Sequence, residues 1–262
     1  MTKARFLQGT FVTLICLFIL APIVSVTLGA FTETAYVVFP PRGFTFKWYL
    51  NAFRQGQAID ALLCSLGLAA ASATIATIVA FGIANTTRQR NSRFYGFLRA
   101  LALMPAMLPA VFLGLALLVA YSWLHLRGLP ALLVGHVIIA MPFALSMIAV
   151  GLNALNPQLE SAARSLGASP RQVLFKITLP LIGWSLLSGW GFAFMVSFGA
   201  LEVSLFLSSS TVVTLPVYIF ASLEWMPMDP TLTAVASGVI LLTLIVLVVS
   251  ARVARLDRFL RR

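Results

Sequence analysis

Residues 156–180 read NPQLESAARSLGASPRQVLFKITLP, and their capping and turn residues predict two short helices joined by a tight turn. Asn156 is a good N-cap for a helix that begins at Pro157, because the N–H that proline lacks has no partner at the first helical position. Gly167 can end this helix, since glycine enters the left-handed conformation without a steric penalty. The first helix is therefore expected between Pro157 and Gly167.

A second helix is expected directly after the turn. Ser169 can cap it, Pro170 takes the first helical position, and Gln172 completes a Ser-x-x-Gln capping box. Pro180 is expected to interrupt this helix, because it lacks the N–H that an interior position needs. The segment should thus fold as a helix, a turn and a second helix.

The first of these helices carries a narrow apolar stripe. Four side chains recur at the i, i+3, i+4 and i+7 spacing of one helix face: Leu159, Ala162, Ala163 and Leu166. The two alanines allow close approach, so a partner could dock on this face. The alternative is an amphipathic helix that lies on the membrane surface or packs on its own bundle.

The composition of the whole chain is typical of an integral membrane protein. Of its 262 residues, 60% are hydrophobic and only 10% are charged, whereas a soluble domain carries about 25% charged residues. Cys16 and Cys64 lie in apolar runs and indicate neither a disulfide framework nor a metal site. The net charge of +11 does not indicate nucleic-acid binding, because the basic residues lie between apolar runs rather than on a soluble face.

Six apolar stretches are long enough to cross a bilayer, which takes about 20 residues of α-helix. They are residues 9–31, 61–85, 97–123, 129–152, 181–207 and 231–251. The first is expected to remain as an anchor, because its uncharged run is longer than that of a cleaved signal peptide. The expected fold class is therefore an all-α integral membrane protein with six transmembrane helices.

The distribution of positive charge predicts the orientation, since cytoplasmic loops retain Lys and Arg. With the N-terminus inside, only four of the 18 Lys and Arg residues fall on the outer side: Arg42, Lys47, Arg54 and Arg127. Both the N-terminus and the C-terminus are therefore expected in the cytoplasm.

The loop between the fourth and fifth predicted spans resembles the EAA motif of the inner-membrane permeases of binding-protein-dependent ABC importers. That motif reads Glu-Ala-Ala, three residues, Gly, nine or more residues, then Ile-x-Leu-Pro. The matching positions are Ala162, Ala163, Gly167, Ile177, Leu179 and Pro180. Ser161 stands where the motif has glutamate, and Glu160, one residue earlier, can keep the acidic charge.

The resemblance covers most of the chain and implies its architecture. Residues 214–217, Thr-Leu-Pro-Val, and residues 229–231, Asp-Pro-Thr, extend it beyond the loop. The longer pattern looks closest to the spermidine/putrescine branch, and permeases for iron, sulfate, thiamine and phosphonates look similar. The resemblance implies a type I ABC importer permease (MetI-like) architecture, with residues 1–262 as one transmembrane domain and a coupling loop at about residues 153–180.

The resemblance also implies partners. In this family the loop seats in a cleft of a separate ATPase subunit, which implies a coupling role for Glu160, Ser161, Ala162, Ala163, Leu166, Gly167, Ile177, Leu179 and Pro180. The implied partners are two copies of an ATPase that binds ATP and Mg, a second, paralogous permease subunit and an extracytoplasmic solute-binding protein, in a bacterial inner membrane. The chain itself is expected to be non-catalytic and without a cofactor. None of its three lysines follows a glycine, as the lysine of a P-loop does.

Glu202 is the one acidic residue within a predicted span, and such a charge usually faces the interior of the bundle. In a water-filled path its carboxylate could bind a cationic solute such as a polyamine, with Trp190 or Trp184 offering cation–π contacts. The alternative is that Glu202 lies near the outer end of the fifth span, in water or paired within the protein.

Other unusual residues in the spans have structural interpretations. His136, in the fourth span, is expected to be a hydrogen-bonded packing residue, because no second titratable group lies at helical spacing from it. Pro105, Pro109 and Pro142 each remove a backbone hydrogen bond and can kink their helices, for packing or for gating.

Three other classes of membrane protein compete with the importer permease. A self-sufficient secondary transporter needs interrupted spans in both halves and ionisable residues near the bilayer centre, and neither is expected here. A non-transporting scaffold has no need of an exposed docking helix. A membrane enzyme is disfavoured, because no His cluster, carboxylate pair or nucleophile arrangement occurs in a common segment.

Overall fold

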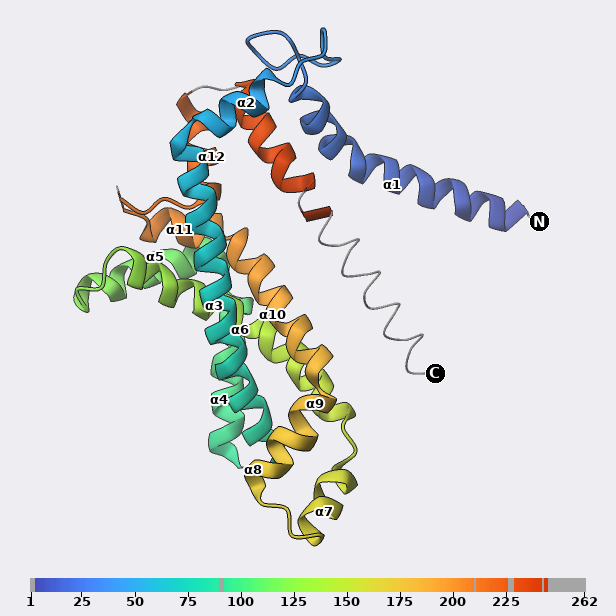
Figure 1. The fold of residues 1–262 in the computed structure, drawn as a ribbon, viewed down its shortest axis with the longest axis vertical. Coiled ribbons are helices and arrows are strands. Elements are labelled where there is room, and N and C mark those ends of the chain that lie inside the picture. Colours follow the sequence, from blue (N-terminus) through green and yellow to red (C-terminus); the bar gives the residue numbers. More distant parts are fainter. Residues whose placement is uncertain (1–2, 90–91, 210, 226–228, 242, 245–262) are drawn as a thin grey trace. The chain divides into compact units, whose positions relative to one another are not determined.

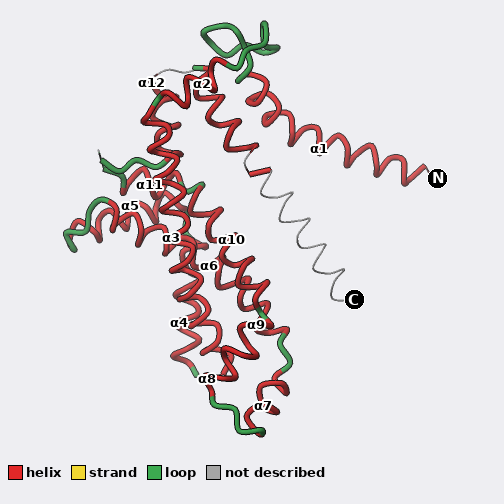
Figure 2. The backbone as a smooth tube through the Cα atoms, viewed as in Figure 1, coloured by secondary structure: helices red, strands yellow, loops and turns green. Residues whose placement is uncertain are grey.

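The computed structural model describes residues 3–89, 92–209, 211–225, 229–241 and 243–244. The elements in this part are helices, and Ser209 and Val212 form an isolated β-bridge (Figure 2). The helices are α1 (Lys3–Gly29), α2 (Lys47–Arg54), α3 (Gly56–Gln89), α4 (Arg93–Leu103), η1 (Met104–Met107), α5 (Ala110–Trp123), α6 (Leu129–Ala154), α7 (Pro157–Ser165), α8 (Pro170–Val173), η2 (Leu174–Thr178), α9 (Leu179–Leu181), α10 (Gly183–Phe198), α11 (Leu201–Leu207) and α12 (Leu215–Trp225), followed by a short apolar helix at Pro230–Leu241 (Figure 1). The all-α prediction is confirmed for the described residues.

The chain divides into two compact units, Ala61–Val217 and the combination of Met1–Asp60 with Tyr218–Arg262. In the described part of the second unit, α2 follows the loop after α1. The indole N–H of Trp48 donates to the carbonyl of Thr32 at 2.6 Å, and the hydroxyls of Tyr49 and Ser237 lie 2.8 Å apart. These bonds connect α2 with the preceding loop and with the helix at Pro230–Leu241.

The core of the Ala61–Val217 unit is built on small residues where α3, α6 and α10 pack together. Buried alanines recur along α3 at three- and four-residue spacing: Ala69, Ala73, Ala76, Ala80 and Ala84. A Cβ atom added at Gly189 on α10 would lie 3.2 Å from the carbonyl oxygen of Ala144 on α6. Small residues at such positions let helix backbones approach closely, which is typical of packing within membranes.

Three described helices are long and apolar enough to span a membrane: residues Leu7–Gly29, Gly56–Gln89 and Leu129–Ala154. They correspond to the first, second and fourth predicted spans. The fourth runs through Pro142 as one helix, Leu129–Ala154. For the sixth predicted span the structure describes the helix at Pro230–Leu241 and residues 243–244, and the later residues, with the C-terminus, lie outside the described residues.

The expectation that the third span is one continuous helix is wrong. The stretch Arg93–Met107 meets Ala110–Trp123 at an angle of 114°. Leu108, between the two, is extended with ψ of 139°, as the residue before a proline prefers. Pro105 and Pro109 also lack the N–H groups that a helix would use here, and the distortion considered for these prolines is a break between two helices rather than a kink.

The fifth span is also interrupted. The helical stretch Pro170–Leu181 meets Gly183–Phe198 at 68°. A second break at residues 199–200 separates α10 from α11. With each bent pair counted as one span, the described residues provide up to five spans. Interrupted spans were not evident from the sequence, and the structure has a break in the third predicted span and another at residues 199–200 of the fifth.

Candidate functional site

The loop that precedes α10 has the predicted capping at its first helix. The Oδ1 atom of Asn156 accepts a hydrogen bond from the backbone N–H of Gln158 at 3.0 Å, and Pro157 is the first residue of α7. Gly167 has φ of +86°, the left-handed conformation that the sequence predicts for it. In Figure 1, α7 lies at one end of the Ala61–Val217 unit, beyond the end of α6.

The second helix of the loop begins as predicted and ends later. The Oγ atom of Ser169 accepts from the backbone N–H of Gln172 at 3.3 Å, and the Gln172 side chain accepts from the Ser169 N–H at 2.8 Å, which completes the capping box. Pro180 does not end this helix, which continues to Leu181. The turn before Pro180, η2, is a π-helix, whose shifted hydrogen-bond register accommodates a residue without an N–H group.

The apolar stripe of α7 is open to its surroundings. Leu166 is 90% exposed and Leu159 is 47% exposed, Ala162 is exposed and Ala163 is half-buried. The same loop carries exposed basic side chains: Arg164 on α7, next to the stripe, and Arg171 and Lys176 after the Gly167 turn. The alternative that this face packs on the chain's own bundle is therefore wrong for Leu166 and Leu159. The loop presents a surface that is apolar at its centre and positively charged at its edge.

Ser161, in the position of the motif's glutamate, is exposed. Its hydroxyl donates to the carbonyl of Pro157 at 3.2 Å, one turn back along α7. At the other end of the motif, Ile177 and Leu179 are half-buried and Pro180 is exposed. The motif residues thus lie along one loop, on both sides of the Gly167 turn, and the stripe and Ser161 form its outer surface.

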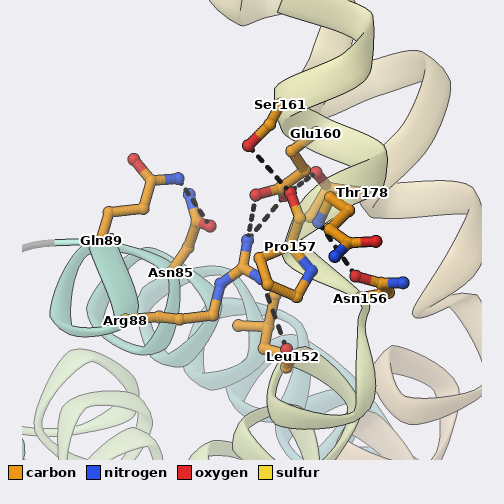
Figure 3. A network of polar contacts seen from close by, with 10 residues as sticks. Asn85, Arg88, Gln89, Leu152, Asn156, Pro157, Glu160, Ser161 and Thr178 are labelled. Carbon is orange, nitrogen blue, oxygen red and sulfur yellow. Dashed lines mark hydrogen bonds and ion pairs between the residues drawn. The ribbon is translucent and has the colours of Figure 1, made fainter.

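Glu160 points the opposite way, into the protein (Figure 3). Both of its carboxylate oxygens accept from Nη2 of Arg88, at 2.6 Å each, and one also accepts from the hydroxyl of Thr178 at 2.7 Å. Nη1 of Arg88 lies 3.5 Å from the carbonyl oxygen of Leu152. Arg88 is near the end of α3, Leu152 is near the end of α6 and Thr178 ends η2, so four elements meet at this ion pair.

The environment of Glu160 favours its charged form. Burial raises the pKa of the Glu160 carboxyl, but hydrogen bonds from Thr178 and Arg88, with the positive charges of Arg88 and Arg164, outweigh burial and lower that pKa below its ordinary value. The ion pair is mostly shielded from water, because the side chains of Arg88 and Glu160 are 17% and 11% exposed. Removing one partner of a buried pair costs about 3–5 kcal/mol, since the other charge is left uncompensated.

Of the residues considered for a solute path, Glu202 and Trp190 lie on neighbouring helices and Trp184 lies apart. Glu202 is exposed in the first turn of α11, just after the break that follows α10. Trp184 lies near the start of α10, at the end opposite to the break that precedes α11.

Trp190 is part of an aromatic row that sequence reasoning missed. The rings of Trp190 and Phe194 stack with centroids 5.3 Å apart, and those of Phe194 and Phe198 stack at 5.9 Å. The indole N–H of Trp190 donates to the hydroxyl of Thr74 on α3 at 3.0 Å. The four-residue spacing of 190, 194 and 198 is the signal that could have revealed the row, and Glu202 continues that spacing beyond the break.

His136 is the hydrogen-bonded packing residue that the sequence predicts. It is buried, with Nδ1 2.8 Å from the hydroxyl of Ser197 on α10 and Nε2 3.0 Å from the hydroxyl of Ser204 on α11. Ser72 on α3 extends the network to Ser197 at 2.8 Å. The imidazole thus connects the helices on both sides of the break between α10 and α11, and these serines were not identified from the sequence.

Comparisons with known proteins identify the family of this chain. The family described as "Binding-protein-dependent transport system inner membrane component" matches residues 72–262. The spermidine/putrescine transport system permease protein PotC of Escherichia coli strain K12 is 28% identical over 254 residues, which cover 96% of this chain and 95% of PotC. The putrescine transport system permease protein PotI of the same strain is 31% identical over 231 residues, which cover 84% of this chain and 80% of PotI.

The fold is shared with a solved importer. A chain in the crystal structure of a bacterial ABC transporter involved in the import of the acidic polysaccharide alginate superposes with a TM-score of 0.74 at 15% identity, over 96% of this chain and 98% of that chain. The predicted resemblance to ABC importer permeases and to their spermidine/putrescine branch is thereby confirmed. Because the family match covers most of its length, this chain belongs to the inner-membrane components of binding-protein-dependent transport systems.

Proposed function

We propose that this chain is the membrane-spanning permease subunit of an ATP-driven importer, and that α7 and its turn dock on a separate ATPase subunit. The observation that carries the proposal is the exposed face of Leu159, Ala162 and Leu166 on a short capped helix outside the spans. An apolar face on a short helix is suited to a groove in a partner, where its side chains lose their contact with water. The exposed Arg164 at its edge favours a groove with an acidic rim.

The remaining subunits of the complex follow from the family. The proposed complex contains two ATPase copies, which bind ATP and Mg, a second permease subunit that is a paralogue of this chain, and a solute-binding protein outside the inner membrane. This chain contributes no catalytic residue and no cofactor. ATP binding would bias an equilibrium between inward-facing and outward-facing arrangements through contacts at α7. With α7 in the cytoplasm, the termini take the orientation that the positive charges predict.

A polyamine is the proposed solute. Relatives named as spermidine and putrescine permeases support this choice, and so do the stacked aromatic rings of α10 together with Glu202, which lies four residues after the last of these rings. Aromatic faces attract ammonium groups, and a carboxylate provides the counter-charge. A polyamine carries several ammonium groups on an apolar chain, which this combination of carboxylate and aromatic rings suits.

Uptake measurements test the transport proposal. The chain is expressed with its candidate ATPase, second permease and binding protein in cells that lack polyamine uptake, and labelled spermidine and putrescine are compared with iron, thiamine and a phosphonate. Saturable polyamine uptake that stops when the ATPase is inactivated supports the proposal. Uptake that an ion gradient drives without the ATPase would identify a secondary transporter, and uptake of none of these solutes would favour a scaffold.

Glu202→Gln tests the solute path separately. The concentration of spermidine at half-maximal uptake is expected to rise severalfold, up to about tenfold. The rise is no larger because the carboxylate is exposed and water weakens its attraction for a cation. Asp229→Asn is a matched control, because it removes an acidic charge outside the predicted spans. An unchanged half-maximal concentration in Glu202→Gln would remove Glu202 from the path.

A further inference from the structure

α7 has a single buried side chain. Of its nine described residues, Glu160 is the only one that is buried. The residues on either side of Glu160, Leu159 and Ser161, are exposed, and Ala163 is half-buried. A helix with so small an apolar anchor can pivot on its flanking turns, unless polar contacts fix its direction.

Those contacts converge on Glu160. Its carboxylate is hydrogen-bonded to Arg88 and Thr178, and the same guanidinium reaches the carbonyl of Leu152. We propose that Arg88, Glu160 and Thr178 form a positioning clamp that fixes α7 to the ends of α3, α6 and η2, so that a push on α7 moves these helices. The second half of this statement rests on the proposed docking of an ATPase at α7.

The chemistry of the clamp suits the transmission of force. Arg88 has a planar guanidinium that donates to the carboxylate through Nη2 and to a main-chain carbonyl through Nη1, so its orientation is fixed by two different elements. Thr178 lies in the π-helical turn that leads into α9 and the 68° bend before α10. A displacement of Glu160 therefore reaches both the second span and the start of the fifth.

A distance measurement within this chain tests the clamp without reference to any ATPase. Both native cysteines are replaced by serine, spin labels are attached at Gln89→Cys and Ser165→Cys, and the full chain is placed in lipid nanodiscs with the subunits that co-purify. A single narrow distance distribution is expected, and Glu160→Gln or Arg88→Met should broaden it. Arg93→Met is the matched control, because Arg93 is an exposed arginine of the neighbouring helix.

Thr178→Val is a milder variant, because it leaves both charges of the ion pair in place and is less able to unfold the protein. Thr178→Val removes one hydrogen bond to Glu160 and keeps the ion pair, so it should broaden the distribution less than Glu160→Gln does. A distribution that stays as narrow as that of the parent chain in Glu160→Gln, Arg88→Met and Thr178→Val would overturn the clamp, whatever the function of the chain.

The ratio of solute imported to ATP hydrolysed tests the second half of the proposal. Glu160→Gln should keep the ATPase bound and lower this ratio by about tenfold, within the range of about 5- to 150-fold that is usual for coupled sites. In Glu160→Gln the charge of Arg88 is left without its partner, which should lower the yield of folded protein. The double variant Arg88→Met with Glu160→Gln removes both charges, so it should restore the yield but not the ratio of solute imported to ATP hydrolysed. A ratio that recovers together with the yield would assign the pair a structural role only and would contradict the transmission of force.

Discussion

Glu160 and Ser161 are adjacent in α7 and face opposite ways: the Glu160 carboxylate is buried against Arg88, whereas Ser161 is exposed. The position of the motif's glutamate thus belongs to the outer surface of the loop, and the acidic residue one place earlier belongs to the interior. In this chain the carboxylate holds α7 in place, and the exposed surface around Ser161 has basic side chains at its edge.

Exchanging these two residues should strongly reduce transport. The double variant Glu160→Ser with Ser161→Glu keeps the composition and the net charge but leaves Arg88 buried without its partner. We expect solute uptake to fall at least about tenfold, the effect of roughly 1.4 kcal/mol, which is less than a broken buried pair usually costs. Ser161→Glu alone serves as the control, because an exposed position tolerates a carboxylate, and its uptake should stay within about twofold of the parent. Equal loss in both variants would place the important residue at Ser161 instead.

Gly167→Val should stop transport while the protein still inserts in the membrane. The residue has φ of +86°, where a β-branched side chain is strained by more than the roughly 1–2 kcal/mol that left-handed backbone costs an ordinary residue. Space is not the obstacle, since no atom lies within 4 Å of an added Cβ. Gly167→Asn should therefore keep most of the uptake, because asparagine tolerates this conformation. Normal uptake by Gly167→Val would show that the turn is not needed.

The clamp should be insensitive to alkaline pH and should open in acid. The pKa of Glu160 is lowered from an ordinary value of 4.5, so its stabilising contribution is complete above pH 4.5 and is lost as the pH falls through the lowered pKa. The distance distribution between labels at Gln89→Cys and Ser165→Cys should hence be constant from pH 8 down to about pH 4.5 and should broaden as the pH falls through the lowered pKa. Thr178→Val takes away a bond that lowers the pKa, so its broadening should begin at a higher pH. A transition near neutral pH would contradict the assignment to Glu160.

His136→Ala should destabilise the Ala61–Val217 unit. It removes the hydrogen bonds between the imidazole and the hydroxyls of Ser197 and Ser204, which keep their bonds to Ser72 and to the carbonyl of Ala200. Each lost hydrogen bond costs about 0.5–1.5 kcal/mol. The thermal midpoint of the purified protein in detergent should fall by several degrees. Ser146→Ala is the control, because Ser146 bonds only within α6, to the carbonyl of Pro142 among the described residues, and its loss should have little effect. An unchanged midpoint for His136→Ala would mean that the network contributes no stability.

Helix caps and tight turns are the features of this structure that the sequence predicts well. Asn156, Gly167 and the Ser169–Gln172 capping box act through neighbours within three residues, so their geometry follows from the chain itself. The approximate positions of the apolar helices follow for a similar reason, because hydrophobic length is a property of a single segment.

Interactions across the fold are the part that could not be predicted. Arg88 and Glu160 are 72 residues apart, and nothing in either segment indicates that their side chains meet. The break at Gly199 is likewise held by His136 on another helix, which binds on both sides of it. Pro109 shows an intermediate case: the proline predicted a distortion, but the 114° angle depends on how α5 packs against α11.

Cysteine crosslinking from α7 tests the central claim most directly. In a background without native cysteines, Ala162→Cys or Ala163→Cys is crosslinked to the co-expressed candidate ATPase in native membranes, with and without ATP, and Ser122→Cys is the control on the side predicted to lie outside. A specific crosslink from α7 that changes in yield with nucleotide, and none from Ser122→Cys, is the predicted result. No crosslink from either alanine position to an ATPase that is well expressed would contradict the proposal that α7 couples this chain to ATP hydrolysis.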